Sequence, residues 1–194
     1  MGDPDGAGPA SAGRVRNAHT VPGILVLQGT AAAATVSLHT IAGAGSVAEL
    51  SGPGIMSGLA ATGIGGAVGG LATLGVLPGL IGVGAVHHAL RDDEIFSKEE
   101  REARAAGRAG SVAGAAVGAV GGIAAVSTAG SVAGLGGAGI TSGLAAVGSA
   151  IGGGMAAGVM ITILAPAACA VGGGFGLYKT WSGLRTIRAQ DQST

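Results

Sequence analysis

The chain has 194 residues, no net formal charge, 42 glycines, and only 2% aromatic and 10% charged residues. About a quarter of the residues in a typical soluble domain are charged, so this composition argues against an ordinary water-soluble globule. Zero net charge and the scarcity of aromatic rings also exclude a basic, base-stacking surface, and we expect no nucleic-acid partner.

The N-terminal part of the chain divides into a tail and an apolar tract. Residues 1–20 are rich in Asp, Pro and Gly and contain no apolar run, which predicts a flexible tail. Residues 21–90 carry one formal charge, Glu49, and exceed the roughly 20 residues that cross a bilayer once. We interpret them as a first membrane hairpin, with segments at residues 21–48 and 55–90 joined by a glycine-rich turn.

A charged stretch follows at residues 91–108. Ser97 and Glu100 have capping-box spacing, and Glu100 and Arg104 are placed to form an ion pair one helical turn apart. The pattern predicts a solvated linker and a third helix that starts near Lys98. A protein partner that binds this linker is the alternative interpretation.

The second apolar tract, residues 109–181, has no charge before Lys179. We expect a second membrane hairpin with segments at residues 109–133 and 140–178, followed by a polar tail at residues 182–194. An aromatic and basic group at its end is typical of a helix end at the lipid headgroups: Tyr178, Lys179, Trp181 and Arg185.

The two hairpins are similar to each other in sequence. Residues 45–61 match residues 130–146 at an offset of 85, in the shared order Ser-Val-Ala and Ile-x-Ser-Gly-Leu-Ala-Ala. After a one-residue slip, residues 69–72 match residues 153–156. The pattern predicts an all-α fold of two tandem glycine-zipper hairpins, with about four main helices.

Each copy carries one proline in its second segment, Pro78 or Pro166. Proline removes a backbone hydrogen bond and disturbs the preceding turn of a helix. We therefore expect a kink, or a break into two shorter helices, at these two positions.

Glycines recur every fourth residue early in the second tract, so that they share one helix face. Each costs about 1 kcal/mol of helix stability in water relative to alanine, whereas in lipid this spacing lets helices pack closely. Ser57 and Ser142, at equivalent positions, are suited to interhelical hydrogen bonds. The predicted helix-packing residues are Gly110, Gly114, Gly118, Gly122, Gly54, Gly58, Gly139, Gly143, Gly154 and Gly158.

Lysine and arginine occur in three places only: Arg14 and Arg16, residues 91–108, and residues 179–188. Because positively charged loops stay on the cytoplasmic side of a membrane, we expect the N-terminus, the linker and the C-terminus to be cytoplasmic. The predicted location is a multi-pass position in a membrane, with the lipid bilayer as a partner.

We expect no catalytic, cofactor-binding or metal site, and no enzyme activity. Gly134–Gly139 has the letters of a dinucleotide fingerprint but lacks the acidic residue that follows one. Cys169, the single cysteine, is interpreted as a packing residue, and His87 and His88 as an interfacial helix end. His39 lies deeper in an apolar segment, where a neutral hydrogen-bonded imidazole and a pH-sensitive contact are both open interpretations.

The residues from Gly137 to Ala146, from Gly152 to Gly158 and from Gly174 to Lys179 resemble the Gly/Ala-rich domain of the interferon-alpha-inducible small hydrophobic membrane proteins. The resemblance is strongest over residues 137–179. It implies an integral membrane protein linked to membrane destabilisation, cell death or innate defence, and it supplies no catalytic residue. In that family the domain is usually single, whereas here it is doubled.

These observations favour a non-enzymatic membrane protein that forms a homo-oligomer and acts on the bilayer by oligomerisation or by opening a pore. Two alternatives stay open: a membrane scaffold without pore activity, and a water-soluble assembly of Ala/Gly helices. The second is retained because alanine and glycine insert into membranes less readily than leucine.

Overall fold

The computed structural model describes residues 28–47, 50–92 and 95–191, with side chains up to residue 185. The described residues are helical, with no strand among them, and the all-α prediction is confirmed. A helix at residues 28–44 is followed by α2 (Gly52–Thr62), α3 (Ala67–Ala89), α4 (Lys98–Ala129), α5 (Gly137–Ser149) and α6 (Met155–Asp191).

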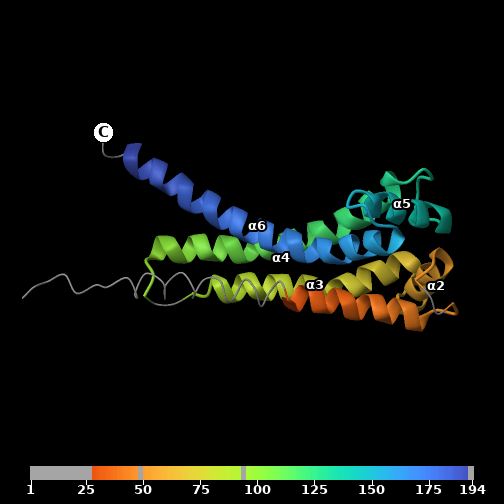
Figure 1. The fold of residues 1–194 in the computed structure, drawn as a ribbon. Helices are drawn as coiled ribbons and strands as arrows, with labels where there is room; N and C mark the ends of the chain where they lie inside the picture. The colour runs from red at the N-terminus through yellow and green to blue at the C-terminus, as the bar shows by residue number, and fades with distance from the viewer. Residues whose placement is uncertain (1–27, 48–49, 93–94, 192–194) are drawn as a thin grey trace, which may run out of the picture.

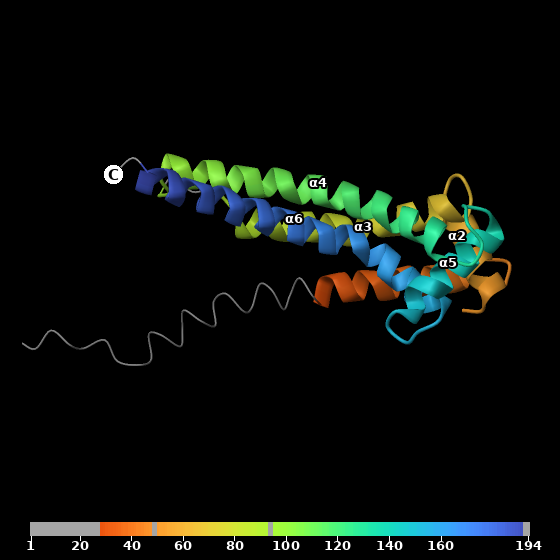
Figure 2. The same ribbon diagram turned by 90° about the horizontal axis from the view of Figure 1, so that it is seen from above.

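The long helices run side by side along one axis, in two layers (Figure 1). Residues 28–89 form the lower layer of that view, and α4, α5 and α6 form the upper one. Figure 2, seen from above, shows α4 and α6 lying side by side along most of their length. The loop between α3 and α4 lies at one end of the bundle, and α2 and α5 lie at the other.

Three helices are long and apolar enough to cross a membrane: α3, α4 and the Met155–Arg185 part of α6. At 1.5 Å per residue, α3 alone is about 34 Å long, against about 30 Å for the hydrocarbon core of a bilayer. The charged side chains that the structure describes all belong to residues 91–108 and 179–185. The spanning parts of these helices therefore carry no formal charge.

Of the two outcomes predicted at Pro78 and Pro166, a kink or a break, the break into two shorter helices is wrong. Both prolines lie inside continuous helices, α3 and α6. The chain breaks earlier, between α2 and α3 and between α5 and α6, and these two turns contain positive-φ glycines, Gly66 at 77° and Gly152 at 73°. Glycine adopts this left-handed backbone at little cost, so the chain turns readily at these positions. A proline can stay inside a helix because neighbouring groups form hydrogen bonds with the carbonyl that it leaves without a partner.

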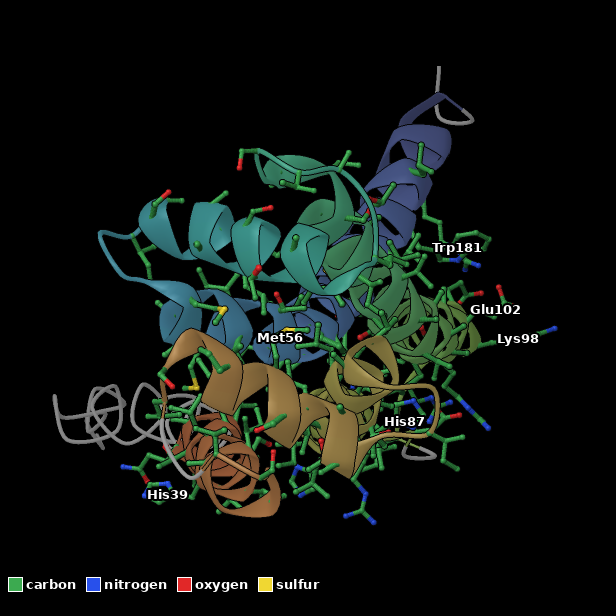
Figure 3. The ribbon with its side chains drawn as sticks, turned by 90° about the vertical axis from the view of Figure 1, so that its right-hand side faces the viewer. His39, Met56, His87, Lys98, Glu102 and Trp181 are labelled. Atoms are coloured by element: carbon green, nitrogen blue, oxygen red, sulfur yellow. The ribbon has the colours of Figure 1, made fainter. Side chains whose placement is uncertain are left out.

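The short helices α2 and α5 lie across one end of the bundle, with Met56 between the two layers (Figure 3). Large apolar side chains gather there, and each isoleucine or leucine makes many small van der Waals contacts with its neighbours. This apolar cluster draws on both halves of the chain: Ile41, Ile55, Leu59, Ala67, Leu71, Val126, Ile140, Leu144, Val159 and Ile163.

The two halves of the chain share an order of elements: a long helix, a short helix and another long helix. The third helices begin at Ala67 and Met155, which differ by 88 positions. Gly70 faces the carbonyl of Leu59, as Gly158 faces that of Leu144. The one-residue slip predicted for residues 69–72 is therefore not the register of the contacts, because α5 runs two residues further than α2 and the turn after it is one residue longer.

The start of α4 follows the predicted capping pattern. The Ser97 hydroxyl accepts a hydrogen bond from the backbone N–H of Glu100 at 3.3 Å, and Glu100 pairs with Arg104 at 3.0 Å. At the other end of the chain, α6 continues to Asp191, beyond the point where the second apolar tract ends. The tail at residues 1–20 and Glu49 lie outside the described residues.

The contact of Gly158 gives a stability prediction. A Cβ there would overlap the Leu144 carbonyl, whereas a Cβ at Gly172, in the same helix, meets nothing within 4 Å. Gly158→Ala should lower the free energy of unfolding by about 1–3 kcal/mol because overpacking forces the helices apart. Gly172→Ala should leave it unchanged or raise it by up to about 1 kcal/mol. Unfolding of both variants in mixed micelles, followed by circular dichroism, measures the difference; equal effects would contradict the contact.

Candidate helix-packing site in the apolar bundle

The glycine face of α4 lies against α6. A Cβ at Gly110 would stand 2.6 Å from the carbonyl oxygen of Gly173, and one at Gly118 would stand 2.5 Å from that of Ala165. Between them, Gly114 faces the carbonyl of Cys169. No side chain larger than hydrogen fits at these points, so the two backbones approach more closely than ordinary helix packing allows.

The contact loosens toward the far end of α4. A Cβ at Gly122 would stand 3.3 Å from the Thr162 methyl carbon and 3.4 Å from its carbonyl oxygen. A neighbour at this distance needs to move only slightly to admit a methyl group. The closest backbone approach is therefore centred on Gly110, Gly114 and Gly118.

A second set of glycines lies on α3, which also packs against α6. A Cβ at Gly79 would stand 3.2 Å from the ring of Pro166, and one at Gly82 would stand 2.9 Å from Ala167. Gly75 also faces Pro166, at 3.5 Å. The sequence reasoning missed these residues, although glycines three and four positions apart signal a shared helix face. α6 thus contacts two glycine-bearing helices.

The other predicted packing glycines are distributed over the bundle end and its turns. Gly58 faces the Ile41 carbonyl, and Gly143 faces that of Val126. Gly54 is buried in α2, and Gly139 faces the backbone of the preceding turn. A Cβ at Gly154 would meet nothing within 4 Å, although the Gly154 carbonyl faces Gly148 of α5.

The two equivalent serines bond to turns and not across helices, contrary to the prediction. The Ser57 hydroxyl oxygen accepts from the backbone N–H of Val47 at 3.4 Å, and that of Ser142 accepts from Val132 at 3.3 Å. In each half the serine holds the turn that precedes its own short helix. A backbone N–H that would otherwise lack a partner in lipid is satisfied in this way.

Polar side chains inside the bundle form hydrogen bonds with backbone carbonyls of their own helix. Buried Ser111 donates to the Arg108 carbonyl at 2.7 Å, and buried Thr162 donates to that of Gly158 at 2.8 Å. Among the described residues, no buried side-chain nitrogen or oxygen lacks a hydrogen-bond partner. The interior therefore supplies no group aimed at a ligand.

Charged side chains tie α4 to α6 at the linker end. Glu100 accepts from the Tyr178 hydroxyl at 2.8 Å and from Arg104 at 3.0 Å, and Arg185 pairs with Glu102. The Arg104 guanidinium also stacks on Phe96, 3.8 Å from the ring centroid. We call these six residues the linker-end clamp: Phe96, Glu100, Glu102, Arg104, Tyr178 and Arg185. They join the predicted linker to the aromatic and basic group predicted at the end of the second apolar tract.

The histidines are separated in the structure. His87 and His88 are exposed at the end of α3, where the His87 Nε2 atom lies 3.4 Å from the Arg108 carbonyl oxygen. His39 is on the outer side of the first helix, far from them (Figure 3). Within the described ranges, no group of three or more His, Cys, Asp or Glu side chains is placed to hold a metal ion.

Comparison of the chain with family models, curated proteins and solved structures finds no match. The resemblance over residues 137–179 therefore rests on those residues themselves. What the described geometry offers is a contact surface between helices, with no arrangement of nucleophile, base and acid for covalent chemistry.

The linker-end clamp can be tested by removing one hydroxyl group. Tyr178→Phe should lower the free energy of unfolding in mixed micelles by about 1 kcal/mol, because a partly exposed hydrogen bond to a carboxylate is lost. Thr180→Val is the control, since the Thr180 hydroxyl bonds only within α6, to the Gly176 carbonyl. A Tyr178→Phe loss no larger than that of the control would contradict a role for this contact.

Proposed function

We propose that this chain is a non-enzymatic integral membrane protein that self-associates and acts on the bilayer by permeabilising it. The observation that carries the proposal is the apolar outer surface of the long helices. Leu80, Val117 and Val120 are 62%, 67% and 71% exposed, while Gly79, Gly82, Gly110, Gly114 and Gly118 of the same helices face α6. A soluble bundle would place its large apolar residues inside.

The proposal includes two tandem copies of one glycine-zipper unit. Matching contacts in the two halves support it: Gly58 with Gly143 against the first helix of each half, and Gly70 with Gly158 against the short helix. A role in defence or cell death also belongs to the proposal, through the resemblance to the interferon-alpha-inducible proteins. A protein partner at residues 91–108 is not needed for it.

Leakage from liposomes tests the permeabilising activity. The purified wild-type protein should release a trapped dye, and Gly114→Leu with Gly118→Leu should abolish release because the leucines push α4 away from α6. Gly121→Leu is the matched control: Gly121 is exposed on α4, with nothing within 4 Å of its Cβ position, and the variant should leak like the wild type. An inert wild-type protein at high loading would reject the proposal.

Two further measurements separate the alternatives. A scaffold without pore activity would give defined oligomers on crosslinking but no dye release. A water-soluble Ala/Gly assembly would pass into the supernatant when membranes are washed with alkaline carbonate. Retention in the washed membranes together with dye release is the result expected here.

The proposed topology places the linker in the cytoplasm and the α2–α5 end outside. Phe96 is in the loop before α4 and Ala138 is in α5, at opposite ends of the bundle (Figure 1). In a Cys169→Ala background, a thiol introduced by Ala138→Cys should react with an impermeant maleimide in intact cells, and one introduced by Phe96→Cys only after lysis. Labelling of both thiols in intact cells would contradict this topology.

A further inference from the structure

The first helix of each half has an outer face, and the two faces differ in chemistry. The matched contacts of Gly58 with Ile41 and of Gly143 with Val126 align residues 28–44 with α4 at an offset of 85. In this alignment Thr35 corresponds to Val120 and His39 to Ala124, and all four residues are exposed. One outer face is therefore polar where its counterpart is apolar.

These polar groups lie at the depth of the spanning segments. Val120 is close to the middle of the uncharged part of α4, residues 109–129, and Thr35 occupies the corresponding level in the first helix. His39 is one turn further along, about 6 Å away at 1.5 Å per residue. Both side chains lie within the roughly 15 Å half-thickness of the hydrocarbon core.

The hydrogens of this face are already used within the helix. The Thr35 hydroxyl donates to the Ala31 carbonyl and the Thr40 hydroxyl to that of Val36, each at 2.9 Å. The His39 Nδ1 atom lies 2.9 Å from the Thr35 carbonyl oxygen; because a carbonyl only accepts, Nδ1 carries the proton. The threonine oxygens and His39 Nε2 remain to form hydrogen bonds with whatever covers this face.

We propose that the outer face of residues 28–44 lines a water-filled path through the assembled protein, while the matching face of α4 meets lipid. Acyl chains form no hydrogen bonds with these polar groups, and an ionisable side chain at this depth favours a water-filled cavity, where water can bond to Thr35, Thr40 and His39. The inference rests on the proposed membrane function and names the residues that face the water. His39 points away from α4 and α6, as this arrangement requires (Figure 3).

Thiol reactivity at matched positions tests the inference. In the Cys169→Ala background, full-length single-cysteine variants Thr35→Cys, His39→Cys, Val120→Cys and Ala124→Cys are reconstituted in liposomes and treated with a water-soluble methanethiosulfonate. Thiols react as thiolates, which form in water, so the first two variants should be modified at least about tenfold faster than their counterparts. The readout is mass spectrometry, which does not depend on leakage.

The possible results separate this inference from the proposed function. Slow modification at all four positions, with dye release still present, would overturn the water-lined face and leave the membrane activity standing. Fast modification at all four would overturn both, because the whole bundle would then lie in water. Faster modification of the α4 positions than of their partners would also overturn the assignment of the two faces.

Discussion

The close backbone approach of α4 to α6 at their glycines is the constraint on which the bundle depends. Gly110 and Gly118 let the carbonyls of Gly173 and Ala165 approach to distances that any Cβ would obstruct. At such separations many backbone atoms are in van der Waals contact, and each contributes a small attraction that sums along the interface. In lipid this attraction is a principal force between helices, since apolar burial gains nothing against acyl chains.

The rest of the architecture follows from the presence of glycine at the contacts between the long helices. Large apolar residues are then left for two other places: the cluster that α2 and α5 cover, and the outer surface, where Val117 and Val120 are exposed. Charge is confined to the linker end, where Glu100 and Arg185 connect α4 and α6 through partners on the other helix. The helices are thus joined by backbone contact in the apolar part and by polar pairs outside it.

Much of the helical framework could be predicted from the sequence, because uncharged tracts and the Ser97 capping pattern are local signals. The positions of the breaks could not. The sequence predicts a kink or a break at Pro78 and Pro166, yet both prolines lie inside continuous helices. The chain turns instead where Gly66 and Gly152 take positive φ values. A positive φ is a property of the folded backbone, and in a chain with 42 glycines composition alone does not single out these two.

Under the proposed duplication, the two halves keep glycine at the matched contact positions Gly58 and Gly143 but differ at matched outward positions. A glycine such as Gly58 or Gly143 meets a backbone carbonyl in its own half, so any change there disturbs that half directly. Outward positions such as Thr35 and Val120 are exposed, so packing inside the half restrains them less. Two copies with the same internal packing can therefore present unlike surfaces, and in the proposed assembly the polar surface of residues 28–44 is the one that faces water.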